Sequence, residues 1–227
     1  MVAPDTAHAV MTEGEDFAVM NVSARHTRVL HKGITRMFCA VRQAAPFNEL
    51  SHCKKCGETR FATKLHARAC TYCQDGVVQI TWLPASAERE MFRLLRSGGA
   101  LHVAASIYRE DPNPLGFIQT VPCALLGLSG LIADGVTKDI VRTIGRFDRY
   151  VYVSSAALDK SMEGLGVDQV LLEHALRHWD QGEGAPLLVR VMPGSDVARA
   201  YESLGMKVCA RLGKDQGHIM GGVLRAR

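Results

Sequence analysis

The sequence contains no uninterrupted apolar run close to the roughly 18 residues that a membrane-spanning helix needs. Its 227 residues are 47% hydrophobic and 22% charged, a composition typical of a soluble globular protein. The first 16 residues include four acidic residues and no Lys or Arg, so they lack the basic start of a secretory signal. We therefore expect a cytoplasmic protein without a membrane partner, with one main domain and a small appendage.

A disulfide pattern is also missing. The chain has seven cysteines, an odd number, and four of them fall between residues 53 and 73. Such a cluster favours metal binding over disulfides. The other three, Cys39, Cys123 and Cys209, lie singly in apolar surroundings, and we interpret them as small core residues.

The clustered cysteines form two CxxC pairs separated by thirteen residues: Cys53, Cys56, Cys70 and Cys73. Each pair can point both sulfurs at one spot, and a hairpin between them completes the tetrahedral set that zinc prefers. Residues 59–63 and 77–82 read as short strands. Four sulfur ligands leave no open position for water or substrate, so we predict a structural Zn²⁺ in a zinc ribbon over residues 49–84.

The predicted ribbon is basic. Between Cys53 and Cys73, five basic residues against Glu58 give a side-chain charge of +4. Two interpretations are open: the cluster binds a nucleic-acid backbone, with Phe61 and Tyr72 stacking on bases, or it offsets the negative charge of a zinc tetrathiolate. The candidate nucleic-acid-binding residues are Lys54, Lys55, Arg60, Lys64 and Arg68.

From residue 85 onward, helix-like and strand-like segments alternate, as in a mixed α/β (α+β) domain spanning 85–227. Residues 1–48 are expected to be a separate N-terminal segment, partly flexible. We predict helices at 86–97, 137–144, 167–179 and 195–204, and strands at 101–108, 115–120, 149–154, 187–191, 207–212 and 219–224.

A glycine-containing turn leads into the longest predicted helix. The string Ser161-Met-Glu-Gly164-Leu-Gly166-Val167 follows the strand that ends at Ser154. Glycines let the backbone approach a ligand closely, and the free N–H groups that open a helix attract an anion. We therefore predict an anion-binding site at this turn.

Two strings together resemble the GNAT superfamily of acyl-CoA-dependent acyltransferases. The first is Tyr150-Val-Tyr-Val-Ser with the glycine turn, and the second is Ala198-Arg-Ala-Tyr201-Glu-Ser-Leu-Gly205-Met206. The resemblance covers residues 85–227 and implies a mixed, splayed sheet flanked by helices. It also implies that the turn receives the pyrophosphate of coenzyme A. The implied cofactor-binding residues are Val153, Ser154, Ser161, Gly164, Leu165, Gly166 and Val167.

The resemblance further implies that an amine attacks a thioester directly and that Tyr201 protonates the leaving thiolate. The alternative is that Tyr201 only packs in the core. Glu163 is the candidate base, with Glu110 and Asp159 also near in sequence, although each suits a solvated surface equally. His102 carries no motif, and His174 and His178 have a spacing that can bind metal but commonly does not.

One residue departs from the GNAT pattern. Ser161 stands where the superfamily has Arg or Gln. Three interpretations of this departure are open. The chain binds coenzyme A less tightly than members of the superfamily do, or its donor is an acyl-tRNA or aminoacyl-tRNA held by the ribbon. The third is that the chain is a non-catalytic GNAT-like nucleic-acid-binding module. The sequence does not specify the acyl group or the oligomeric state. The amine acceptor is either a small molecule or a macromolecule.

Overall fold

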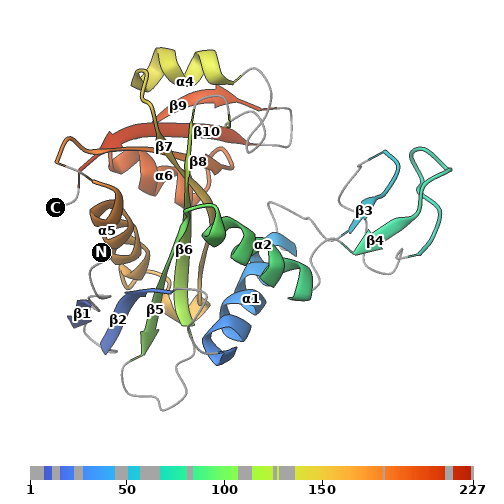
Figure 1. Ribbon diagram of the computed structural model, residues 1–227, viewed down its shortest axis with the longest axis horizontal. Coiled ribbons are helices and arrows are strands. Elements are labelled where there is room, and N and C mark those ends of the chain that lie inside the picture. Colours follow the sequence, from blue (N-terminus) through green and yellow to red (C-terminus); the bar gives the residue numbers. More distant parts are fainter. Residues whose placement is uncertain are drawn as a thin grey trace.

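The computed structural model describes residues 8–11, 16–22, 28–43, 51–56, 67–80, 84–106, 114–124, 127, 136–180, 182–212 and 217–225. They form one large mixed sheet with helices packed on it and a small two-stranded sheet that projects to one side (Figure 1). Among these residues, no helix is both long enough and apolar enough to cross a membrane.

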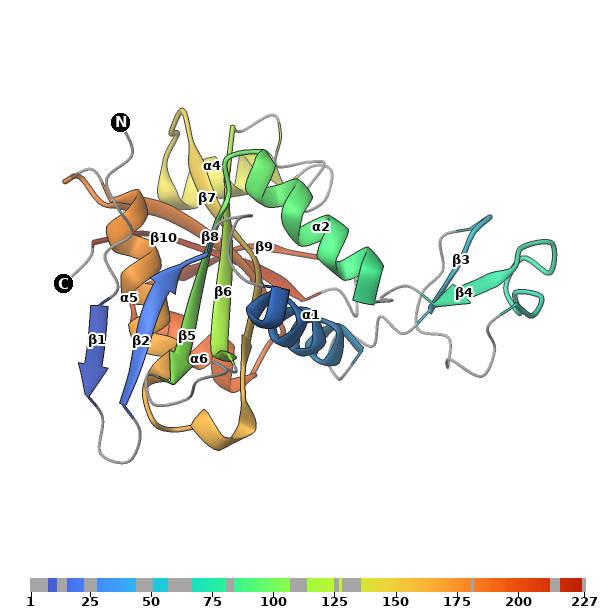
Figure 2. The same ribbon diagram turned by 60° about the horizontal axis from the view of Figure 1, so that its bottom comes forward.

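The large sheet has eight strands in the order β1-β2-β5-β6-β7-β8-β10-β9. Neighbouring strands are antiparallel except for β7 and β8, which are parallel. Figure 2 shows β1, β2, β5 and β6 side by side. The strands are β1 His8–Met11, β2 Asp16–Asn21, β5 Ala100–Ser106, β6 Pro114–Cys123, β7 Tyr150–Leu158, β8 Ala185–Val191, β9 Lys207–Arg211 and β10 His218–Leu224.

Helices cover both faces of this sheet. They are α1 Arg28–Gln43, α2 Pro84–Arg96, α4 Thr137–Ile144, α5 Val167–Trp179 and α6 Asp196–Ser203. Phe117 of β6 belongs to the core cluster under α1 and α2, whereas Ile118 belongs to the cluster under α5 and α6. Because successive strand residues point to opposite faces, the two helix pairs lie on opposite sides of β6.

All the helices predicted from residue 86 onward are present, and α5 has the predicted bounds. The predicted strands are present too, with β6 continuing to Cys123 and β7 to Leu158. The extended β7 ends directly before the glycine turn.

The first part of the chain belongs to the same layered domain. β2 pairs with β5, and α1 packs against α2, β6 and β7. Leu30, Ile34 and Phe38, spaced four apart, bury one face of α1. The expected separation of residues 1–48 from 85–227 is therefore corrected: both parts contribute to one sheet, which completes its core only when β2 and α1 are added.

The small sheet pairs β3 Ser51–Cys53 with β4 Val78–Ile80. It lies in the chain between α1 and α2 and projects beyond them (Figure 1). The ribbon is thus an insertion between two helices of the main domain. β4 overlaps the strand predicted at 77–82, whereas the strand predicted at 59–63 lies outside the described residues.

Candidate functional site

The glycine turn begins where β7 ends. A short 3-10 helix, Lys160–Met162, leads into Gly164 and Gly166, whose φ angles are 80° and 74°. This left-handed region strains any residue that has a Cβ atom. A Cβ atom built at either glycine would meet nothing within 4 Å, so the space beside both is open to a ligand.

Helix α5 starts immediately after the turn with free backbone donors. Gly166 caps the helix without a side-chain hydrogen bond. No backbone acceptor in the described part of the chain pairs with the amides of Gly164, Gly166 or Val167. Together with the positive end of the helix dipole, these amides create a place that favours an anion.

Ser161 has a structural partner in the same turn. Its hydroxyl donates to Asp159 Oδ1 at 2.6 Å, and its amide donates to the same oxygen at 3.0 Å. These hydrogen bonds lower the pKa of Asp159. Asp159 therefore caps the 3-10 helix, and the Ser161 hydroxyl is bound to this capping carboxylate. A carboxylate with a lowered pKa is also a weaker base, which argues against Asp159 as the proton acceptor.

β7 and β8 separate next to this turn. They pair only from Val151 to Val153 on β7 and from Leu187 to Val189 on β8. β7 then continues to Leu158 without a β8 partner, while β8 stays paired with β10 up to Val191. The described strands thus diverge toward the turn.

A β-bulge marks the point of divergence. Gln119 and Thr120, adjacent on β6, oppose Ser155 and Val153 on β7, which leaves Ser154 without an opposing residue. The Ser154 hydroxyl donates to the Gln119 carbonyl at 3.2 Å. Arg42 Nη2, from the last turn of α1, donates to the Ser154 carbonyl at 2.8 Å. Neither Arg42 nor Gln119 was among the predicted site residues, since no local motif marks them.

Tyr201 lies close to the start of α5. Its side chain is buried in the cluster that contains Val153 and Val167. Burial, and then the Asp168 carboxylate in the first turn of α5, raise the pKa of Tyr201. The phenol therefore keeps its proton at neutral pH. The structure brings Tyr201 and the glycine turn into one neighbourhood.

The candidate bases are less well placed. Glu163 is exposed and forms the end of the 3-10 helix, where its amide donates to the Lys160 carbonyl. Its position is in the turn itself, beyond the end of β7. Glu110 lies outside the described residues.

The four cysteines of the ribbon converge on one point. All four sulfurs lie within 4.8 Å of one another, with Cys53–Cys73 at 3.7 Å and Cys56–Cys70 at 3.8 Å. A tetrahedron with Zn–S bonds of about 2.3 Å places its sulfurs about 3.8 Å apart. The cluster therefore fits a zinc ribbon.

Backbone amides around the cysteines also suit thiolates. The Lys55 amide donates to Cys53 Sγ and the Tyr72 amide to Cys70 Sγ, both at 3.4 Å. The hydrogen bond from the Cys56 backbone contributes most to lowering the pKa of Cys53, to about 6. Position 76 requires glycine, because a Cβ atom there would overlap Cys53 Sγ.

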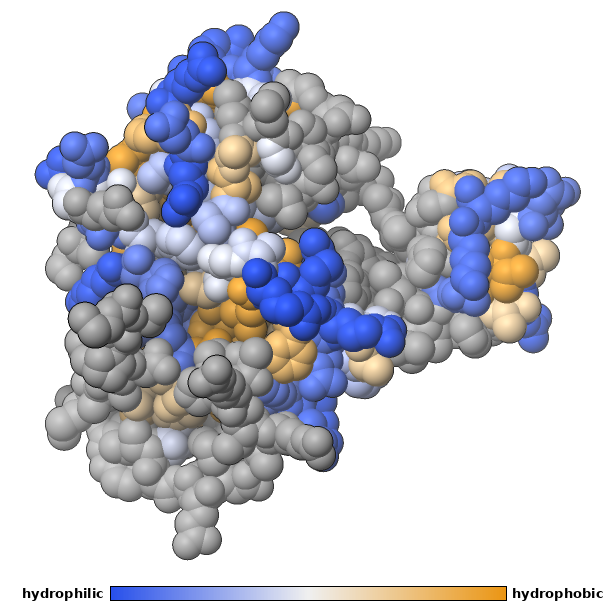
Figure 3. All heavy atoms as spheres, in the orientation of Figure 1, coloured by the Kyte–Doolittle hydropathy of each residue, from blue (hydrophilic) through white to orange (hydrophobic). Residues whose placement is uncertain are grey.

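The ribbon surface carries exposed basic residues and one large exposed ring. Lys54, Lys55 and Arg68 are exposed, and Tyr72 is 71% exposed. Lys55 pairs with Asp75 at 2.7 Å, which offsets part of the positive charge. Figure 3 shows both hydrophilic and apolar residues on the projecting ribbon and, on the main domain, an apolar area bordered by hydrophilic residues. Arg60, Lys64 and Phe61 lie outside the described residues.

Three histidines meet between β5 and α5. His102 is fully buried, and its Nδ1 lies 3.1 Å from Nδ1 of His174. The His178 ring lies 5.4 Å from that of His102. Burial, then His174 and His178, lower the pKa of His102 well below its usual value. Within the described residues, only the four cysteines bring enough ligand atoms together to hold a metal ion.

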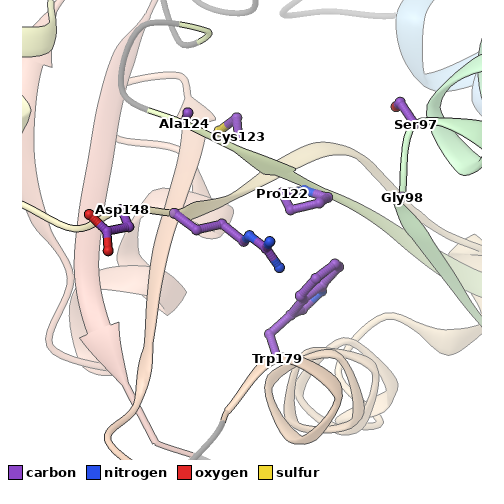
Figure 4. Close-up of a pocket in the computed structure, with 8 residues that line it drawn as sticks. Ser97, Gly98, Pro122, Cys123, Ala124, Asp148 and Trp179 are labelled. Carbon is purple, nitrogen blue, oxygen red and sulfur yellow. The ribbon is translucent and has the colours of Figure 1, made fainter.

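A separate cavity of about 450 Å³ lies at the other end of α5. Trp179, the last residue of α5, and Arg149 line it. In Figure 4 the Trp179 ring points into the cavity, whereas the Asp148 side chain turns away. Cys123 also lines it, and burial raises the pKa of that thiol to about 12, which makes it a poor nucleophile. None of the predicted site residues borders this cavity.

The fold matches solved acetyltransferase structures. An arylalkylamine N-acetyltransferase 7 of the yellow fever mosquito Aedes aegypti matches with a TM-score of 0.58 at 8% identity, over 97% of this chain and 94% of that chain. A GNAT-family acetyltransferase from Staphylococcus aureus Mu50 matches with a TM-score of 0.50 at 12% identity, over 92% and 99%.

A third match is the NatC complex bound to Gag peptide and CoA, with a TM-score of 0.51 at 10% identity, over 90% of this chain and 95% of that chain. No protein-family model matches this sequence, and no curated protein does. The structural matches confirm the predicted fold: the chain has the GNAT acetyltransferase fold, with an inserted four-cysteine cluster that fits a zinc ribbon.

Proposed function

We propose that this chain is an N-acyltransferase that moves an acyl group from an acyl-CoA to an amine. The observation that carries the proposal is the divergence of β7 and β8 beside an open glycine turn with free amides. A pantetheine arm fits between diverging strands, and a pyrophosphate fits the amides at the start of α5. The influence of Asp168, in the first turn of α5, on Tyr201 supports a role for Tyr201 beside this turn.

The residues of the chain suggest roles in this reaction. The amine nitrogen attacks the thioester carbonyl, the C–S bond breaks, and an amide forms. The leaving sulfur takes a proton from the Tyr201 hydroxyl, which burial keeps protonated. The amine loses one proton, either to water or to Glu163, the exposed carboxylate in the turn.

Acetyl-CoA binding tests the proposal directly. Thermal denaturation should show a rise in Tm that grows with acetyl-CoA concentration, because a ligand that binds only the folded state stabilises it. Dephospho-coenzyme A and free pantetheine separate the contributions of the phosphates from that of the arm. Absence of a Tm shift at millimolar acetyl-CoA would argue against acyl-CoA as the donor.

We further propose that the four cysteines bind one structural Zn²⁺ and that the ribbon contacts nucleic acid, with tRNA as donor or acceptor. The exposed Lys54, Lys55 and Arg68 beside the exposed ring of Tyr72 support this proposal. Affinity for tRNA should fall steeply with salt and after replacement of Lys54, Lys55, Arg60 and Lys64. Unchanged tRNA affinity in that variant would refute the nucleic-acid role.

A non-catalytic nucleic-acid-binding module is the second candidate, favoured by Ser161, whose hydroxyl is engaged by Asp159. One measurement distinguishes the two candidates: the wild-type chain transfers an acyl group if it is an enzyme and does not if it is a binding module. A cytoplasmic location remains a proposal.

A further inference from the structure

Ser154 is the point where the main sheet stops forming regular backbone pairs on both edges of β7. On one edge it is the unpaired residue of the bulge opposite β6. On the other edge it follows Val153, the last residue paired with β8. Its backbone geometry is therefore held by side-chain hydrogen bonds in addition to the regular strand pairing.

A side chain of α1 and a β6 side chain anchored to the backbone of α2 supply that support. Arg42 of α1 donates to the Ser154 carbonyl at 2.8 Å. Gln119, whose carbonyl and Oε1 accept from the Ser154 hydroxyl at 3.2 and 3.5 Å, donates through Nε2 to the Met91 carbonyl of α2 at 3.1 Å. Gln119 is fully buried, so this network is a fixed part of the core.

Arg42 is itself held in place. Its guanidinium carbon lies 5.5 Å from the centre of the Phe38 ring, one turn earlier on α1. Its charge also contributes to lowering the pKa of Glu90 on α2, after the larger effects of Arg93. The planar guanidinium is thus positioned by an aromatic ring and an acidic neighbour while it binds the bulge carbonyl.

We propose that Arg42 is a positioning residue for acyl transfer, which fixes the backbone of the Ser154 bulge where the thioester is placed. This inference rests on the proposed function, because the diverging strands are taken to hold the acyl-CoA. A backbone segment beside a reacting thioester must not reorganise during the reaction. Arg42 supplies that rigidity from a helix that does not belong to the glycine turn.

The test compares Arg42→Met, Arg42→Lys and the control Arg36→Met, an exposed position on the same helix. We expect Arg42→Met to lower kcat at least tenfold while KM for acetyl-CoA changes less than threefold. Arg42→Lys, which keeps the charge and a donor nitrogen but not the planar guanidinium, should recover part of the loss. Added ethylguanidinium should raise kcat of Arg42→Met and leave Arg36→Met unchanged.

Amide hydrogen exchange gives a readout that does not depend on activity. Arg42→Met should increase exchange at residues 153–156 at least tenfold and leave β10 as in the wild type, whereas Arg36→Met should change neither. If the wild-type chain transfers no acyl group, the proposed function fails and the exchange result still decides whether Arg42 fixes the bulge. Wild-type exchange at 153–156 in Arg42→Met, or a change confined to KM, would overturn the inference.

Discussion

At the scale of single residues, Tyr201 is the side chain whose surroundings most affect the proposed chemistry. It is buried beside the first turn of α5, and its pKa is raised by that burial and by Asp168. A raised pKa keeps the phenol protonated and shifts its ionisation in the folded protein above pH 10, but it also makes the phenol a weaker proton donor. The same pattern would arise for a packing residue, so a functional measurement must separate the two.

Tyr201→Phe removes only the hydroxyl. We expect kcat to fall about 100-fold, within the range for loss of a general acid, while the fold is retained. The matched control is Tyr150→Phe: that tyrosine is also buried, and its hydroxyl donates to the Gly145 carbonyl at 2.8 Å. Its loss should cost about 1 kcal/mol of stability and leave kcat unchanged. A Tyr201→Phe enzyme with wild-type kcat would assign Tyr201 to packing.

His102 predicts an acid sensitivity of the fold. Its pKa is lowered in the folded protein, so the unfolded chain binds the proton more readily. The stability that neutral His102 provides is present above pH 6.5 and decreases as the pH falls below that value. The Tm of the wild type should therefore drop between pH 7.5 and 5.5, and drop less in His102→Leu. The control His218→Leu should show the same drop in Tm between pH 7.5 and 5.5 as the wild type. An equal drop in Tm in all three proteins would contradict the prediction.

At the scale of elements, the two ends of α5 provide a matched comparison. Gly166 at the start and Gly182 after the end both have positive φ, 74° and 99°, and both border open space. Alanine at either position introduces backbone strain of about 1–2 kcal/mol.

Only the start of α5 is proposed to face a phosphate. Gly166→Ala should therefore weaken acetyl-CoA binding at least tenfold by calorimetry, because a methyl group enters the space beside the free amides. Gly182→Ala should bind as the wild type does. Equal affinities in the two variants would place the phosphate elsewhere.

At the scale of the whole molecule, the ribbon is an insertion with very little core of its own. Its buried cluster consists of Cys53, Cys70 and Val78 with Cys73 against it. So small a core does not fold without added stabilisation, which the proposed zinc supplies. The main domain has separate and much larger clusters on both faces of its sheet.

Removal of zinc should therefore unfold the ribbon and leave the main sheet folded. Native mass spectrometry should find one zinc per chain, and after chelation the amides of β3 and β4 should lose hydrogen-exchange protection while those of β6 and β7 retain it. The Cys70→Ser variant should behave like the metal-free protein, and Cys209→Ser, a cysteine outside the cluster, should not. Full protection of the ribbon without metal would exclude a structural zinc.

Sequence alone was sufficient where a local pattern specifies the structure. The two CxxC pairs identified the cysteine cluster, and apolar periodicity with the glycine turn gave the bounds of α5. The sequence strings around Gly164 and Tyr201 identified the fold. Local requirements select the residue types in these strings, namely a left-handed backbone at the glycines and an apolar face on each helix.

Tertiary structure decided what depends on contacts between distant segments. It placed β2 and α1 in the main sheet, because a short strand has a partner only when the sheet assembles. It brought Arg42 to Ser154, 112 positions apart, and His102 to His174, 72 positions apart. Local periodicity carries no information about such pairs, since the geometry that joins them exists only after the strands have twisted and the helices have docked.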